Sequence, residues 1–422
     1  MKRIIIIAAL AAAVLTPLTA FTDKTGFGSI LWTYRLENKG NMGEFHGMSG
    51  PMYHNNRIYF TANWESYLYC LDAETGKKIW HFPFTVSAYQ NFKDHGMTWT
   101  AGGHVINRVP IKLAAPLLIS GDRIFFGASS FALFFGTVYC VNADTGKLVW
   151  RYPARSEVWQ APQSRHNGRI YLDIGCLEDA TGRLLWAHND LYRNGISADG
   201  NIVMSADNGS TMVYHTHGTN PPLWILSSAN DKNPRRFDDI TSVEAIFPSS
   251  HEGRIFISGT NENSMAAIFC VDLRTGKLAW KKPLGTGRIV IGKSHLVGDG
   301  RVICAVGSTA GEDGHYLVAL DGRDGRSLWE VPVSLKYDVI FEPTYYQGNV
   351  YFTEHPHTLR CVSADTGKTL WTVQYMQPGR LDSVDYKAPA IHGNRAYVTL
   401  YMNSISSREI IKKEIICINI ER

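Results

Sequence analysis

The sequence predicts an all-β fold, an eight-bladed β-propeller of four-stranded antiparallel blades, because two different markers each recur eight times along the chain. The first marker is an eleven-residue phrase that ends in tryptophan, as in Cys70 to Trp80. The second is a polar hairpin turn followed by strand-favouring apolar residues, as in Asn55 to Phe60. Because a four-stranded sheet cannot bury both of its faces alone, the recurring sheets are expected to pack radially around one axis.

Seven copies of the phrase keep an offset of ten residues from the first position to the tryptophan, and they end at Trp80, Trp150, Trp186, Trp224, Trp280, Trp329 and Trp371. The copy before Trp224 is the most degenerate, since Pro221 and Pro222 replace its turn. The eighth copy is split, with its front half at Ile415 to Arg422 and its back half at Ser29 to Tyr34. We therefore expect the N-terminal strand to pair with the C-terminal blade and to close the ring.

The hairpin turns mark the same eight units, and they begin at Asn55, Gly121, Asn167, Asp199, Glu252, Asp299, Gln347 and His392. Each unit is predicted to contain an inner strand, this turn, a second strand, a variable connection, a third strand, the Asp-x-x-Thr-Gly-Lys turn and a fourth strand. Because strand direction alternates, both short turns lie on one face of the ring. The longer connections lie on the other face, and long loops on a rigid scaffold are where function concentrates.

Six of the seven cysteines occupy one equivalent position of the repeated phrase, namely Cys70, Cys140, Cys176, Cys270, Cys361 and Cys417. Only Cys304 lies elsewhere. Equivalent positions on neighbouring units should lie farther apart than the roughly 7 Å between Cα atoms that a disulfide allows. We therefore expect free thiols that act as small buried hydrophobes.

Residues 1–20 are predicted to be a signal peptide, and residues 21–422 a single propeller domain. Lys2 and Arg3 precede an apolar run from Ile4 to Leu15, which is short for a bilayer span. Leu18 is larger than the residue preferred at that place before a cleavage site, so an uncleaved anchor stays open as an alternative. The predicted location is periplasmic or secreted.

The composition narrows the class of partner. A formal net charge of only +4 gives no reason to expect nucleic acid or an anionic membrane as a partner. No later stretch reaches transmembrane length, and no cysteine precedes Cys70, which argues against a lipoprotein. We expect a monomer that binds an envelope protein or a polysaccharide.

The phrase resembles the pyrroloquinoline-quinone-like (PQQ-like) β-propeller repeat, most fully at Asn142 to Trp150 and Ser363 to Trp371. That superfamily includes quinoprotein dehydrogenases and the propeller lipoprotein of the outer-membrane assembly machine. The resemblance implies that the turn glycine and the tryptophan dock neighbouring blades. It assigns this structural role to Gly76, Gly146, Gly276, Gly367, Trp80, Trp150, Trp186, Trp280, Trp329 and Trp371.

Two groups of residues on the face with long loops are candidates for ligand binding. The loop from Thr85 to Ile111 carries His95, Trp99 and His104, which suit a carbohydrate or peptide platform or else hold the loop in place. The entries to the inner strands, at the mouth of the central channel, carry His46, Tyr192, Arg193, Glu342 and Lys387. These residues form either a ligand site or a solvated rim of mixed charge.

No catalytic motif matches the repeat in strength, so enzyme activity stays uncertain and we lean against it. The sequence has no adjacent cysteines of the kind that quinoprotein dehydrogenases carry, and we expect neither PQQ nor calcium. We expect no metal, because zinc needs three or four ligands and no Cys or Glu cluster completes the pair His355 and His357 or the pair His215 and His217. A binding or scaffold protein is the favoured interpretation. The alternatives are a polysaccharide lyase using Tyr, His and Arg at the channel mouth and, with less support, a quinoprotein oxidoreductase.

Overall fold

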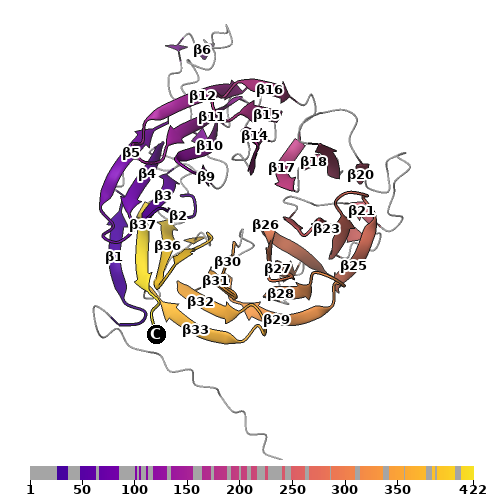
Figure 1. Ribbon diagram of the computed structural model, residues 1–422. Helices are drawn as coiled ribbons and strands as arrows, with labels where there is room; N and C mark the ends of the chain where they lie inside the picture. The colour runs from indigo at the N-terminus through magenta and orange to yellow at the C-terminus, as the bar shows by residue number, and fades with distance from the viewer. Residues whose placement is uncertain are drawn as a thin grey trace, which may run out of the picture.

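Eight antiparallel sheets of four or five strands are arranged around a common axis in the computed structural model of the protein (Figure 1). The structure describes residues 26–36, 48–62, 66–84, 100–101, 104–105, 111–112, 117–130, 135–154, 164–172, 175–187, 192–198, 201–206, 211–215, 224–226, 240–242, 249–261, 266–285, 287–308, 314–335, 342–355, 357–376, 383–384, 387–403 and 410–422. In that part of the chain no helix has the length and apolar character needed to cross a bilayer.

We number the sheets in chain order. Sheet 1 contains β2 (Met52–His54), β3 (Arg57–Ala62), β4 (Tyr67–Asp72) and β5 (Lys78–Pro83). Sheet 2 contains β8 (Ile111–Lys112), β9 (Leu118–Ser120), β10 (Arg123–Ser130), β11 (Phe135–Asn142) and β12 (Leu148–Ala154). Sheet 3 contains β13 (Ser164–His166), β14 (Arg169–Leu172), β15 (Gly175–Glu178) and β16 (Leu184–Ala187). Sheet 4 contains β17 (Tyr192–Ala198), β18 (Asn201–Ala206), β19 (Thr211–His215) and β20 (Trp224–Leu226).

The second half of the chain repeats this order. Sheet 5 contains β21 (Ile240–Ser242), β22 (Ser249–His251), β23 (Arg254–Asn261), β24 (Ala266–Asp272) and β25 (Leu278–Gly285). Sheet 6 contains β26 (Arg288–Gly298), β27 (Arg301–Ser308), β28 (His315–Asp321) and β29 (Ser327–Val333). Sheet 7 contains β30 (Thr344–Tyr346), β31 (Asn349–Glu354), β32 (Thr358–Ser363) and β33 (Thr369–Gln374). Sheet 8 contains β34 (Ser383–Val384), β35 (Ala390–His392), β36 (Arg395–Asn403), β37 (Ile410–Asn419) and β1 (Ile30–Arg35).

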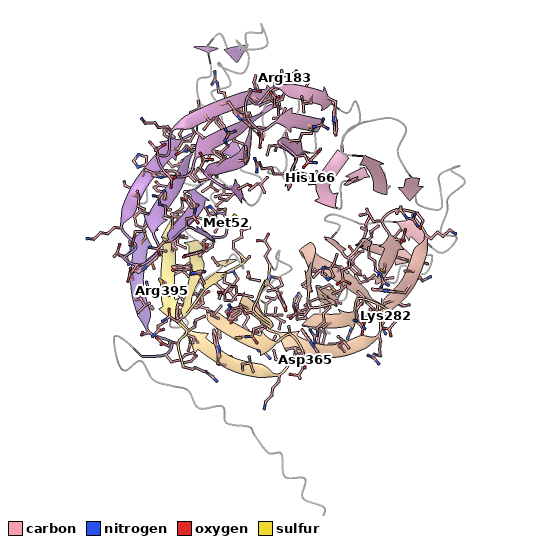
Figure 2. All side chains as sticks on the ribbon, in the orientation of Figure 1. Met52, His166, Arg183, Lys282, Asp365 and Arg395 are labelled. Carbon is pink, nitrogen blue, oxygen red and sulfur yellow. The ribbon has the colours of Figure 1, made fainter. Side chains whose placement is uncertain are left out.

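Chain order within each sheet runs from the axis outward, so that β2 with Met52 is innermost in its sheet and β25 with Lys282 is outermost in its own (Figure 2). The outermost strand of sheet 8 is β1, which comes from the other end of the chain. It pairs with β37, and Trp32 lies opposite Cys417 (Figure 1). The expected split of one unit between the two ends of the chain is therefore present as a strand pair.

Three sheets differ from the four strands expected of each unit. In sheets 2, 5 and 8 two short strands pair with the same second strand, in place of one inner strand. The second strands β10, β23 and β36 are eight or nine residues long, so they offer enough backbone groups for both partners. The connection from the preceding sheet thereby becomes part of the sheet that it enters.

The apolar cores lie between neighbouring sheets. Phe60 of sheet 1 packs in one cluster with Tyr397 of sheet 8, and Tyr59 packs in another with Phe126 of sheet 2. All four of these side chains are at most 1% exposed. Burying such a side chain stabilises a fold by about 1.5–3 kcal/mol. Sheets 8, 1 and 2 are therefore held together by the apolar cores between them.

The cysteines confirm the interpretation drawn from the repeat. All seven are free and buried. Cys70 lies opposite Trp80 in the strand register, and the same pairing recurs at the equivalent cysteines of four other sheets and at Cys417 with Trp32. Burial raises the pKa of the Cys70, Cys140, Cys176, Cys304 and Cys417 thiols to about 12. These thiols fill core space and are not poised for chemistry.

Candidate binding face and its supporting joints

Trp80 of sheet 1 packs directly on the turn of sheet 2. A Cβ placed on Gly146 would lie 2.6 Å from the indole ring, and Gly146 has a φ of +68°. The indole Nε1 of Trp80 donates a hydrogen bond of 3.1 Å to the carbonyl of Ala143 in the same turn. Only glycine combines this backbone conformation with so close an approach. The same ring-on-glycine contact joins Trp32 to Gly76, Trp150 to Gly182, Trp280 to Gly325 and Trp329 to Gly367.

The remaining assigned residues have other surroundings. The ring of Trp371 meets Phe27 edge-on at 5.4 Å between centroids, and the ring of Trp186 lies beside Tyr171 at 6.4 Å. Gly276 has the left-handed conformation of the other turn glycines, with a φ of +68°. The tryptophan equivalent to its expected partner is Trp224, whose side chain lies outside the described residues.

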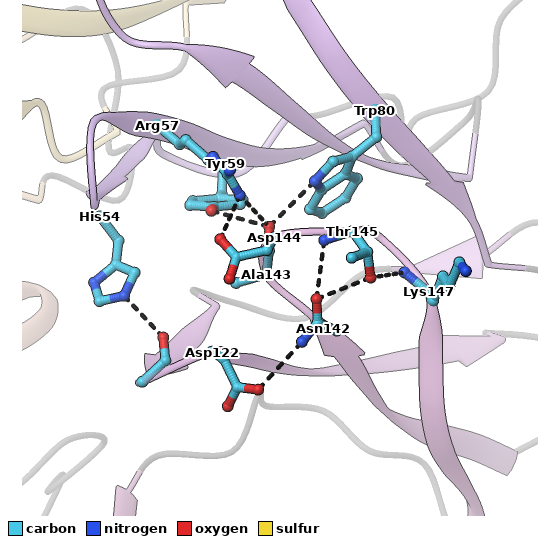
Figure 3. Close-up of polar contacts among 11 residues, drawn as sticks. His54, Arg57, Tyr59, Trp80, Asp122, Asn142, Ala143, Asp144, Thr145 and Lys147 are labelled. Atoms are coloured by element: carbon cyan, nitrogen blue, oxygen red, sulfur yellow. Dashed lines mark hydrogen bonds and ion pairs between the residues drawn. The ribbon is translucent and has the colours of Figure 1, made fainter.

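An arginine reinforces each joint, and the sequence reasoning missed it. Arg57 Nη1 donates to the carbonyl of Ala143 at 3.1 Å and to Asp144 Oδ1 at 2.7 Å, and the Tyr59 hydroxyl donates to the same carbonyl at 3.2 Å (Figure 3). Equivalent arginines reach the next turn in four other sheets, namely Arg123, Arg254, Arg301 and Arg395. The available signal was the arginine that directly follows most of the hairpin turns.

The polar side chains of the repeated phrase make hydrogen bonds within its own turn. Asp72 Oδ1 accepts hydrogen bonds of 2.7 Å from both the backbone N–H and the hydroxyl of Thr75, and these bonds hold the pKa of Asp72 below its usual value. In sheet 2 the neutral Asn142 accepts the same two bonds from Thr145 (Figure 3). Because an amide replaces the carboxylate without altering the bonds, the position serves as a turn cap and not as a catalytic acid.

On the opposite face, two of the predicted channel-mouth residues, Glu342 and Lys387, lie at neighbouring strand entries. Thr344 Oγ1 of sheet 7 donates to the carbonyl of Pro389 in sheet 8 at 2.6 Å. Glu342 precedes Thr344 by two residues and Lys387 precedes Pro389 by two, and both side chains are half-buried and engaged in contacts. These opposite charges therefore stand at neighbouring entries to the inner strands.

The same group extends to sheet 1. A Cβ on Gly50, just before β2, would lie 3.0 Å from the carbonyl of Ala388 and 3.5 Å from Cβ of Lys387. The entries of sheets 7, 8 and 1 thus touch one another. We call the three residues Glu342, Lys387 and Gly50, which lie at these three entries, the entry cluster. Opposite charges at neighbouring places on a fixed backbone can orient a polar partner.

The other predicted binding residues belong to other segments or fall outside the described residues. Tyr192 and Arg193 lie at the start of β17 in sheet 4, opposite Ala206 and Ser205, with a bulge between Arg193 and Gly195. His104 lies on β7 (His104–Val105), which pairs with β6 (Thr100–Ala101) inside the long loop. The predictions for His46, His95 and Trp99 fall outside the described residues.

A buried ion pair within sheet 7 also bonds to the end of sheet 6 on the loop face, where Arg360 Nη1 donates to the carbonyl of Pro332 at 3.0 Å. Glu354 is 8% exposed, accepts a hydrogen bond of 3.1 Å from the N–H of Ser334 and lies 3.6 Å from the Arg360 guanidinium. Burial raises the pKa of Glu354 above its usual value. The next residue, His355, donates its N–H to the carbonyl of Ser334 at 2.7 Å. These polar contacts fix the hairpin that carries His355 and the buried His357.

The sequence lacks the adjacent cysteine pair that quinoprotein dehydrogenases carry over their cofactor. The cysteines are separated from one another in sequence and buried in strands, so no adjacent pair can lie over a planar cofactor. Within the described ranges no group of three or more His, Cys, Asp or Glu side chains could hold a metal ion.

The antiparallel sheets lie radially, and tryptophans of one sheet pack on turn glycines of the next. These two features define a β-propeller of the PQQ-like repeat class. The chain belongs to the family described as outer membrane protein assembly factor BamB, whose model matches residues 99–306 and 264–404. The predicted periplasmic location agrees with this family.

The chain is also similar to individual proteins. The chain is similar to outer membrane protein assembly factor BamB of Moranella endobia (strain PCIT), 22% identical over 80% of each chain. It is also similar to tetrathionate hydrolase of Acidithiobacillus ferrooxidans, 23% identical over 84% of this chain and 71% of that one. The crystal structure of BamB from Moraxella catarrhalis shares the fold with a TM-score of 0.56 and 13% identity, covering 92% of this chain and 99% of that one.

Proposed function

We propose that the protein is a non-catalytic binding propeller of the bacterial envelope that helps to assemble outer-membrane proteins by holding a protein partner against its loop-bearing face. The observation that carries the proposal is the match to the assembly-factor family from residue 99 to residue 404. The packed sheets described above supply what such a role requires, a scaffold on which the loops keep fixed positions.

We infer that the eight sheets are the eight blades of one closed ring, with β1 completing the last blade. Tryptophan or arginine contacts between consecutive sheets support this inference from sheet 8 to sheets 1, 2 and 3 and from sheet 5 to sheets 6 and 7. The pairing of β1 with β37 supports closure.

Within this proposal the entry cluster contacts the partner through Glu342 and Lys387. We add His46, Tyr192, Arg193, His95, Trp99 and His104 as further contacts on the same face. Opposite charges on a binding face set the orientation and the rate of association more than the affinity. A polysaccharide lyase needs a charge neutraliser beside a proton acceptor, and neither the comparisons nor the described contacts support one, so we do not propose it.

The proposal is tested by cross-linking and affinity capture from the envelope of the native cell. The Lys387→Glu variant should recover the partner at least severalfold less well than the unaltered protein. The matched control is Lys282→Glu, which makes the same charge change on the outer strand β25, away from the face. Equal recovery of the partner by both variants would show that the entry cluster does not contact the partner. Capture of no envelope protein by the unaltered chain would remove the proposed function itself.

The absence of a quinone cofactor is a separate expectation. A ligand that binds the folded state raises the melting temperature by mass action. We expect the melting temperature of the purified protein to stay the same when PQQ and calcium are added together. A rise that grows with the concentration of PQQ would reopen the oxidoreductase interpretation.

A further inference from the structure

The outer strands of the ring have a free edge, and most of them carry residues that block it. In β5, β12, β25 and β29 the residue after the tryptophan is ionisable, namely His81, Arg151, Lys281 and Glu330. The third residue after the tryptophan is proline in the same four strands, namely Pro83, Pro153, Pro283 and Pro332. Charges and prolines at an edge prevent another strand from pairing there.

Two further outer strands are too short to offer a long edge. β16 has four residues and β20 has three. Short edge strands are another way in which sheets avoid unwanted pairing. The four blocked strands and these two short ones account for six of the eight outer strands.

The residues of β33 itself give it neither kind of protection, and the Arg422 side chain covers the outward carbonyl of Leu370 at its start. Its six residues, Thr-Leu-Trp-Thr-Val-Gln, include no charge and no proline, and threonine and glutamine stand where the other strands have an ionisable residue and proline. In the described part of the chain β33 ends its sheet, with β32 as its strand partner (Figure 1). Thr372 is exposed and Leu370 is 38% exposed. The remaining outer strand, β1, also has no proline, but its side chains are mostly half-buried and it ends in Arg35, which pairs with Glu414.

The register shows which backbone groups of β33 face outward. Pro283 lies opposite Ala267 and cannot donate to the ladder, so its nitrogen faces away from the sheet. Gln374 holds the same place relative to its tryptophan, opposite Thr358, and its N–H therefore faces outward. The carbonyl of Leu370 also faces outward, because it accepts a hydrogen bond of 2.8 Å from Arg422 Nη2. An incoming strand would find the backbone groups of Thr372 and Gln374 in register.

We propose that the edge of β33 is a second interaction surface, which binds an extended, uncharged strand of another polypeptide by adding it to sheet 7. The fitting partner alternates threonine or other β-branched residues with aromatic or aliphatic ones and lacks proline, because its neighbours across the edge are Leu370 and Thr372. A charged residue opposite these side chains would have no counter-charge on β33. This surface lies on the outer rim and is independent of the entry cluster.

A binding assay with exchanged edge residues tests the proposal. The probe is a fluorescent ten-residue peptide of alternating valine and threonine, and the control probe is the same peptide with N-methylated backbone at alternate residues, which cannot pair. The variant Thr372→Lys with Gln374→Pro gives β33 the two blocking residues of β25. It should fold, since β25 holds lysine and proline at the equivalent places, and an unchanged urea midpoint checks this.

The unaltered protein should bind the valine–threonine peptide and not its methylated form, and the blocked variant should bind it at least tenfold more weakly. Adding Lys281→Thr and Pro283→Gln to the blocked variant should restore binding at β25. The proposal is overturned by equal affinity of the unaltered and blocked proteins, by binding of the methylated peptide, or by no binding at all. It is also overturned if size-exclusion chromatography shows a dimer that only the blocked variant loses, because a second copy would then occupy the edge.

Discussion

The backbone N–H of Gly28 donates a hydrogen bond of 2.7 Å to the carbonyl of Asn419, across the two ends of the chain. In sheet 1 the N–H of Gly76 donates to the carbonyl of Asp72 at 2.9 Å in the same way. The N–H of Asn419 donates to the carbonyl of Ser29 at 2.9 Å, as Asp72 does to Lys77. The ends of the chain therefore rebuild, without a covalent link, the turn that the other units make with continuous chain.

A chain that begins at Leu36 should be less stable, because it lacks β1 and the Trp32 contact with sheet 1. Truncation of a fully buried tryptophan costs about 3–5 kcal/mol, and loss of the half-buried Trp32 should cost less than that. We expect a lower urea midpoint for this chain, and partial recovery of the midpoint when a peptide of residues 26–36 is added. The same peptide with Trp32 replaced by alanine is the control. An unchanged midpoint in the shortened chain would show that β1 does not hold the ring.

Substitution of Gly146 should reveal the close approach of Trp80. Gly146→Ala combines left-handed backbone strain of about 1–2 kcal/mol with overpacking of about 1–3 kcal/mol against the indole ring. Gly121→Ala is the matched control, since Gly121 has a φ of +61° and a Cβ added there would have no atom within 4 Å. It should show the backbone strain alone. Urea unfolding of both variants measures the difference, and equal losses would contradict a packing role for Gly146.

The periodic parts of this fold could be predicted because each rests on local rules that recur. The turn at Gly76, the cysteine opposite its tryptophan and the split unit at the chain ends follow from one repeated pattern. The arginine joint was missed because Arg57 follows a hairpin turn, where a charged residue normally faces solvent, and only the position of the next sheet brings Ala143 within reach. The two-piece inner strands depend on where a connection of variable sequence enters the sheet, which no periodicity encodes.

The binding residues were harder to predict than the fold for the same reason. Glu342 and Lys387 lie together because the entries of sheets 7 and 8 are tied by the bond from Thr344 to Pro389. That bond involves residues outside the repeated phrase. Tyr192 and Arg193 were grouped with them on strand direction alone, and they belong to sheet 4.

The thiols should be inert while the protein is folded. At pH 8 a thiol with a pKa of about 12, as at Cys70, has about one molecule in ten thousand ionised, and only the thiolate reacts with disulfide reagents. We expect no appreciable reaction of the native protein with an aromatic disulfide reagent, and reaction of all seven thiols in guanidinium chloride. Rapid reaction of one thiol in the native state would contradict the core role of that position.

The buried pair of Glu354 and Arg360 predicts a dependence of stability on pH. Burial raises the pKa of Glu354 in the folded state, so the folded protein binds this proton more tightly than the unfolded chain does. The stability that the group contributes is complete below the unfolded pKa of ~4.3. It is lost as the pH rises through the folded pKa. Glu354→Gln keeps an acceptor for the N–H of Ser334 and cannot ionise. As the pH is raised from 4 toward neutrality, the unfolding free energy of this variant should therefore rise relative to that of the unaltered protein.

Glu330→Gln, on an exposed part of the neighbouring sheet, is the control. Parallel pH profiles for the unaltered protein and Glu354→Gln would show that Arg360 and Ser334 hold the carboxylate as well in the folded protein as water does in the unfolded chain.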